Sequence, residues 1–127
     1  MSLSSAVRGA LARGPEDVAP DTREAEFVFT EDFAGFDGHF PGDPMLPGIA
    51  QIMAVALTVQ PGGTAHTGGT ARLRQIRRTK FVSMVRPGDA MRVRAQYRAI
   101  DEGLLVTAEC ATENGVCAQI KVVLENA

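Results

Sequence analysis

The sequence predicts one α+β domain in which an antiparallel β-sheet wraps around a single buried helix. Two observations lead to this prediction. The segment from Ile49 to Gln60 is apolar on nearly every side, which is typical of a helix that is buried all round. After Ala71 the chain becomes a series of strand-like segments separated by short turns that contain glycine. Strands joined by hairpins form an antiparallel sheet, and the long apolar helix is the element that such a sheet would enclose.

Length and composition fit a single globular domain over residues 1–127. Hydrophobic residues make up 45% of the chain and charged residues 22%, and the formal net charge is −2. A chain of this size can bury a core without a disulfide or a metal. The charge offers no basic face for nucleic acid, and the longest apolar run, Ile49 to Val59, is about half of what crosses a bilayer. We therefore expect no nucleic-acid or membrane partner and, without an apolar leader, a cytoplasmic location.

The first two predicted elements are a short helix and a short strand. Residues 4–13 can form an amphipathic helix with Val7 and Leu11 on one side. Gly14-Pro15 is expected to end it, because both residues disfavour helix continuation. Around residues 25–29, alternating aromatic residues indicate a strand with one buried face.

An irregular loop and the central helix follow. Pro41, Pro44 and Pro47 each lack a backbone donor, so the stretch from Asp32 to Gly48 cannot be a helix or a central strand. Pro47 suits the first turn of the central helix, which is predicted at about 48–60. Four strand-like segments then complete the chain, at residues 71–85, 91–99, 104–112 and 116–124.

One string of residues carries chemical information, Gly38-His39-Phe40-Pro41-Gly42-Asp43-Pro44-Met45-Leu46-Pro47-Gly48. His39 can act as a base near neutral pH and lies in a loop whose path is fixed by glycines and prolines. The start of the following helix offers unpaired backbone N–H groups and a positive dipole end, which can hold a carbonyl or an oxyanion. A base beside an oxyanion site is what removal of a proton α to a thioester carbonyl requires.

This string resembles the signature of the 3-hydroxyacyl-carrier-protein dehydratases of fatty-acid synthesis. Lys80-Phe81 and the segment Val85-Arg86-Pro87-Gly88-Asp89 are similar to a second part of that signature, and the resemblance covers roughly residues 24–124. It implies a hotdog fold, a dimer with active sites at its interface, and loss of water from a 3-hydroxyacyl thioester. The carrier would be acyl carrier protein or coenzyme A. No metal or bound cofactor is implied, because the pantetheine arm arrives with the substrate.

The resemblance also implies roles for individual residues. His39 matches the catalytic base for the C2 proton, and Gly48 matches the glycine whose backbone N–H binds the thioester carbonyl. Further candidates for substrate contacts are Phe40, Pro47, Gln51 and Met53.

At one position the chain departs from the family pattern. The dehydratases carry Glu or Asp on the central helix where this chain has Met53, and no carboxylate lies between Gly48 and Pro61. Loss of an acid–base partner typically lowers a rate by about 10²–10⁴. Gln51 has a counterpart in a subset of dehydratase-like proteins whose motif reads HFPGxPxLPGxxQ, and in a regular helix it faces away from Met53.

Three functions remain open. In the first, the chain is a dehydratase that uses His39 as base and works as a homodimer. In the second, the chain is a non-catalytic or half-catalytic subunit that binds acyl thioesters. It would then form a heterodimer with a hotdog homologue, which supplies the acid. The third is a thioesterase, which the missing carboxylate disfavours almost as strongly as it disfavours a dehydratase that works alone.

Several other polar residues allow both a structural and a functional interpretation. Asp37 and Asp43 could replace the missing acid, although turn residues are the favoured interpretation. Cys110 and Cys117 are expected to be buried free thiols. A group of cations is either the solvated face of a strand, which is favoured, or a docking site for an acidic carrier protein. This group comprises Arg72, Arg74, Arg77, Arg78 and Lys80.

Overall fold

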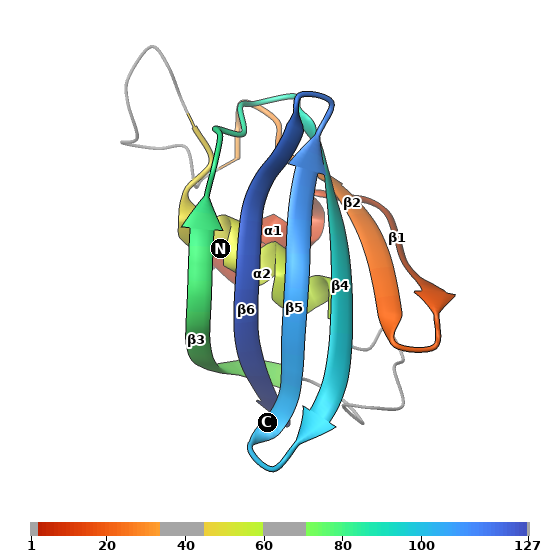
Figure 1. Cartoon of the computed structure of the whole chain (residues 1–127). Coiled ribbons are helices and arrows are strands. Elements are labelled where there is room, and N and C mark those ends of the chain that lie inside the picture. The colour runs from red at the N-terminus through yellow and green to blue at the C-terminus, as the bar shows by residue number, and fades with distance from the viewer. Residues whose placement is uncertain (1–2, 34–44, 60–70, 127) are drawn as a thin grey trace.

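The structure is a computed structural model that describes residues 3–33, 45–59 and 71–126. Within these ranges the chain forms two helices and six strands (Figure 1). The helices are α1 (Leu3–Gly9) and α2 (Gly48–Val59). The strands are β1 (Leu11–Ala19), β2 (Thr22–Val28), β3 (Ala71–Phe81), β4 (Ala90–Ile100), β5 (Gly103–Thr112) and β6 (Gly115–Asn126).

All six strands belong to one antiparallel sheet with the order β1-β2-β4-β5-β6-β3. Both helices lie against the same face of this sheet (Figure 1). β3 follows α2 in sequence but pairs with the last strand, so it forms one edge of the sheet, and β1 forms the other. The predicted α+β architecture, a sheet around a central helix, is therefore confirmed.

The core lies between α2 and the inner face of the sheet. In β4, Met91, Val93 and Ala95 are fully buried while the residues between them are exposed, as strand alternation requires. Phe27 of β2 and Phe29 just after this strand are also fully buried, and their rings stack with centroids 6.2 Å apart. These side chains position α2 relative to the sheet.

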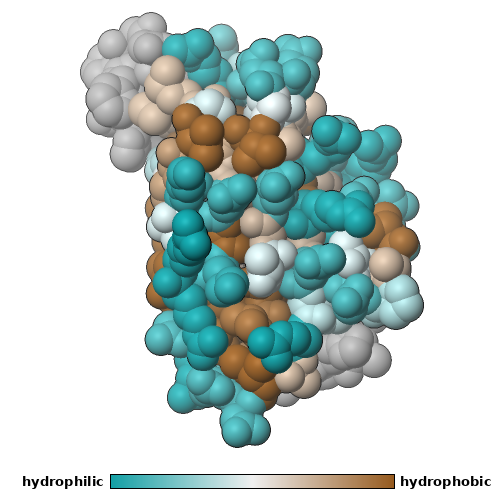
Figure 2. Space-filling view, viewed as in Figure 1, coloured by the Kyte–Doolittle hydropathy of each residue, from teal (hydrophilic) through white to brown (hydrophobic). Residues whose placement is uncertain are grey.

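The outer face of the sheet is largely hydrophilic, interrupted by apolar patches (Figure 2). Leu105 and Val123 are paired in register on this face, and both are buried although they lie outside the main core cluster. Gln75 of β3 is paired with Val123 in register and accepts a hydrogen bond from Arg77, which also forms an ion pair with Glu102 at 2.9 Å. Long polar side chains therefore accompany the apolar residues of the outer face.

The prediction for the N-terminal segment was wrong beyond residue 9. The expected helix of residues 4–13 is confined to α1, and β1 runs through Gly14 and Pro15 instead of stopping there. An edge strand tolerates proline, because the missing donor would face away from the sheet. Gly14 has a φ of 80°, and a Cβ there would lie 2.7 Å from the carbonyl oxygen of Glu24. Gly14 and Pro15 therefore lie inside an edge strand, and the prediction that they end a helix was wrong.

The two cysteines are buried and free, as predicted. Burial raises the pKa of the Cys110 and Cys117 thiols, which keeps both protonated and poor nucleophiles. In the described ranges, neither helix has the length and apolar composition needed to span a membrane.

Candidate functional site

The candidate site is built around the start of α2. Pro47 lies just before the helix, and its carbonyl oxygen accepts hydrogen bonds from the backbone N–H of Ala50 at 3.1 Å and of Gln51 at 3.4 Å. Gly48 is the first residue of α2, so its own N–H has no acceptor within the helix. The positive end of the helix dipole lies at the same place and also attracts negative charge. The expected carbonyl-binding group therefore stands at a helix N-terminus.

The segment after β3 fastens this helix start to the sheet. The N–H of Leu46 donates to the carbonyl of Val85 at 2.7 Å, and both side chains are buried. Gly88 donates its N–H to Phe29 at 2.8 Å, which ties the same segment to the end of β2. Asp89 accepts a hydrogen bond from the backbone of Arg86 at 3.0 Å and closes the turn. The second motif of the sequence therefore contacts the described end of the first one, through Leu46.

Phe81, the last residue of β3, lies against Gly48. A Cβ built on Gly48 would lie 2.6 Å from Cζ and 2.9 Å from Cε2 of the Phe81 ring. Glycine is needed at position 48 because a larger residue would collide with the ring. The backbone conformation does not require it, because its φ is not in the left-handed region. The ring is 47% exposed, so it forms a partly open wall at the helix start. Sequence reasoning noted Phe81 only as part of a motif and missed this contact, for which the chain offers no local signal.

The two sides of α2 have different surroundings. Gln51 is 3% exposed and belongs to the buried side, with Val55 and Thr58 one and two turns further along. Ile49 is 44% exposed and Met53 partly exposed, and they lie one turn apart on the other side. Gln51 therefore faces away from Met53, as expected. Because no residue of α2 is charged, the helix brings no carboxylate to either side.

Gln51 and Thr58 are the two buried polar side chains of α2, and they differ in how their oxygen atoms are satisfied within the described residues. The hydroxyl of Thr58 donates to the carbonyl oxygen of Ala54 at 2.8 Å. The Oε1 atom of Gln51 is buried and has no hydrogen-bond partner among the described residues. An unpaired buried polar group costs about 1–3 kcal/mol, and native proteins keep few of them.

His39 and Phe40 lie outside the described residues, as do Asp37, Asp43 and His66. The roles expected for them therefore stay predictions. In the described part of the chain, no group of three or more His, Cys, Asp or Glu side chains is arranged to hold a metal ion.

The cation group of β3 divides into two parts. Arg72 and Arg74 both bond Glu125, at 3.0 and 2.9 Å, and these hydrogen bonds hold the pKa of Glu125 below its usual value. Arg77 is held by Glu102, as described above. Arg78, by contrast, stands directly opposite Lys121 of β6, and neither forms an ion pair with a described residue. Two like charges in register repel each other.

The fold places the chain among the hotdog proteins. A heterocomplex of dehydratases, ApeI:P from Xenorhabdus doucetiae, contains a chain that superimposes with a TM-score of 0.70 at 24% identity, covering 87% of this chain and 93% of that one. The PaaI protein of Escherichia coli has a TM-score of 0.63 at 12% identity, covering 98% and 89%. These likenesses establish the architecture.

The sequence narrows the class to a family. Residues 16–121 match the ApeI-like family, described as ApeI dehydratase, and the chain belongs to this family. It is also similar to the 3-hydroxyacyl-[acyl-carrier-protein] dehydratase FabZ of Ligilactobacillus salivarius, with 38% identity over 89 residues, covering 63% of this chain and 59% of the relative. The corresponding enzyme of Clostridium acetobutylicum is 30% identical over 109 residues, covering 79% and 74%. The chain thus spans about three fifths of the length of the first of these relatives.

Proposed function

We propose that this chain removes water from 3-hydroxyacyl thioesters whose acyl chain is carried by acyl carrier protein or coenzyme A. The observation that supports this most is the junction of the two family motifs. Val85, in the segment after β3, accepts a backbone hydrogen bond from Leu46, and Phe81 packs on Gly48. Residues of both motifs therefore meet at the start of α2. An N–H without an acceptor inside the helix, next to a partly exposed ring, is an arrangement that suits the binding of a carbonyl group.

The chemistry at this site would be an elimination. His39 takes the C2 proton, the electron pair of the C2–H bond forms the C2–C3 double bond, and the C3–O bond breaks as the 3-hydroxyl takes up the proton from His39 and leaves as water. The N–H of Gly48 and the helix dipole stabilise the charge that develops on the thioester oxygen. Pro47 and Phe40 flank this centre in the sequence and are proposed to contact the substrate. No bound cofactor takes part, because the pantetheine arm belongs to the substrate.

A partner chain is part of the proposal, and β3 is the edge that would receive it. β3 carries five cations and no carboxylate, and three of the five form ion pairs with only two carboxylates, Glu125 and Glu102. The partner is a second copy of this chain or a hotdog homologue. A homologue with acidic residues on the facing edge would suit the cations better than a second copy, because like charges in register repel.

The second candidate function is a half-catalytic subunit, and Met53 is the observation that favours it. Met53 occupies the position of the family's acid and lies on the half-exposed side of a helix without carboxylates. A homologue paired with this chain would then supply the acid. The likeness to a dehydratase heterocomplex from Xenorhabdus doucetiae supports this candidate at the level of the fold.

The test is turnover by the purified homo-oligomer, measured as hydration of enoyl thioesters and dehydration of 3-hydroxyacyl thioesters. We expect measurable turnover that falls at least about 100-fold in His39→Ala. Inactivity of the native chain, followed by activity in Met53→Glu, would replace this function by the half-catalytic subunit. Ile49→Glu is the matched control, because it puts a carboxylate on the same side of α2 one turn earlier. If both glutamate variants and the native chain are inactive, the dehydratase proposal is wrong.

A further inference from the structure

Gln51 is a buried polar side chain of α2 whose amide oxygen is unsatisfied within the described part of the chain. Its Oε1 atom is buried without a partner among the described residues, whereas the other buried polar group of the helix, Thr58, is satisfied by Ala54. The surrounding side of α2 is apolar, with Val55 fully buried one turn on. A leucine there would leave no unsatisfied oxygen atom. The oxygen of the carboxamide therefore adds no hydrogen bond to the described part of the fold.

The position of Gln51 relative to Gly48 indicates that use. Three residues separate them, so they lie on nearly the same side of α2, roughly 4.5 Å apart along its axis. Helical side chains lean toward the N-terminus and cover the preceding turn. A side chain that leans this way extends over the first turn of α2, which begins at Gly48 beside the Phe81 ring. Met53 lies on the other side of the helix and cannot share this position.

We propose that Oε1 of Gln51 accepts a hydrogen bond from the 3-hydroxyl of the acyl chain when the thioester carbonyl is held at the N–H of Gly48. This inference depends on the proposed substrate class. The carbonyl carbon and C3 are two bonds apart, so one acyl chain can reach two groups separated by a helical turn. The hydroxyl would be oriented for departure by an amide, in a helix that has no carboxylate. Gln51 thereby selects hydroxylated acyl chains over saturated ones.

Binding of two matched ligands tests this without turnover. One is a 3-hydroxyacyl pantetheine thioester with two fluorine atoms on C2, which has no C2 proton to lose. The other is the same compound without the hydroxyl. Calorimetric titration of the native chain should show about tenfold tighter binding of the hydroxylated ligand, and Gln51→Leu should bind both equally. A preference that persists in Gln51→Leu would refute the assignment.

Thermal unfolding distinguishes this role from a structural one. Gln51→Leu should raise Tm by about 4 °C, because the unpaired polar atom is replaced by an apolar one. Thr58→Val is the control: it removes a satisfied hydroxyl from the same helix and should leave the ligand preference intact. A fall in Tm for Gln51→Leu, with no ligand preference in the native chain, would make Gln51 a structural residue and the proposal wrong.

The two proposals can fail separately. If the native chain prefers the hydroxylated ligand through Gln51 but never eliminates water, the dehydratase function fails and the assignment of Gln51 stands. If the native chain eliminates water and Gln51→Leu keeps the hydroxyl preference, the function stands and the assignment fails.

Discussion

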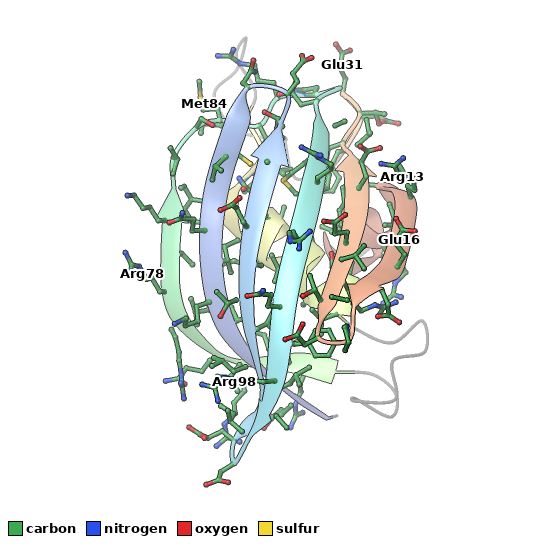
Figure 3. The ribbon with its side chains drawn as sticks, turned by 45° about the vertical axis from the view of Figure 1, so that its right-hand side comes forward. Arg13, Glu16, Glu31, Arg78, Met84 and Arg98 are labelled. Carbon is green, nitrogen blue, oxygen red and sulfur yellow. The ribbon has the colours of Figure 1, made fainter. Side chains whose placement is uncertain are left out.

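The sheet ends in two edge strands, and their compositions differ. β1 carries charges of both signs close together, and Arg13 pairs with Glu26 of its neighbour at 3.8 Å. It also contains Pro15, which cannot donate to a further strand. β3 carries charges of one sign only and no proline. Figure 3 shows Arg13 and Glu16 at the β1 edge and Arg78 at the opposite, β3 edge.

The two edge strands also differ in the large apolar side chains that they expose. Val18 is the large exposed hydrophobic residue of β1, at 43%. β3 and the segment after it expose a whole group, namely Leu73, Ile76, Phe81, Val82 and Met84. Natural sheets protect free edges with charge, proline and irregular pairing. β1 has all three. β3 also has charge and register shifts but no proline, and its group of exposed apolar residues is what an edge that pairs with another chain would bury.

The largest expected effect comes from breaking the β3 edge. Leu73→Lys together with Ile76→Lys adds charge where the proposed partner would bury apolar surface. Loss of such contacts should weaken self-association, or association with a homologue, by about 100-fold or more. Sedimentation velocity over a concentration series measures this. Val18→Lys changes an equally exposed residue of β1 and should leave the assembly intact. Equal effects at both edges would remove the distinction between them.

A smaller effect is expected where β3 ends against α2. Gly48→Ala places a Cβ within 2.6 Å of the Phe81 ring, so the ring must move away from the helix start. Overpacking of this kind costs about 1–3 kcal/mol, measurable by urea unfolding. Phe81→Leu in the same chain should recover part of the loss.

Gly9 supplies the control for this variant. A Cβ on Gly9 meets no atom within 4 Å, so Gly9→Ala should not lower stability. If Gly48→Ala were as harmless as Gly9→Ala, the Phe81 ring would not constrain the helix start.

The elements that the sequence predicted well are those with local, repetitive signals. The alternation around Met91 and the apolar run of α2 each depend on neighbouring residues, and both were found close to their true bounds. β1 was missed because Gly14 and Pro15 have different meanings in a helix and in an edge strand, and only pairing with β2 decides between them.

The site was predictable in its parts but not in its contacts. Gly48 and Gln51 were singled out from the motif, and the structure places both on neighbouring turns of α2. The approach of Phe81 to Gly48 joins residues more than thirty positions apart, so only the folded sheet reveals it. The unpaired Oε1 of Gln51 is likewise a property of the packed interior. A sequence pattern can show that a polar residue is buried but not whether its partner is present.

The smallest effect concerns the cations of the β3 edge, where one substitution should raise stability and weaken carrier binding. Arg78→Glu replaces a repulsive pair with Lys121 by an attractive one, so stability should rise by about 0.2–1 kcal/mol. If Arg78 helps to bind an acidic carrier protein, the same change should weaken carrier binding severalfold at low salt and much less at high salt.

Arg98 is the matched control for this change. It is an exposed arginine on β4 that, like Arg78, has no ion pair with a described residue (Figure 3). Arg98→Glu should weaken carrier binding less than Arg78→Glu does. Equal losses would mean that the carrier responds to the overall charge of the protein, and that the β3 edge is distinguished by its apolar residues alone.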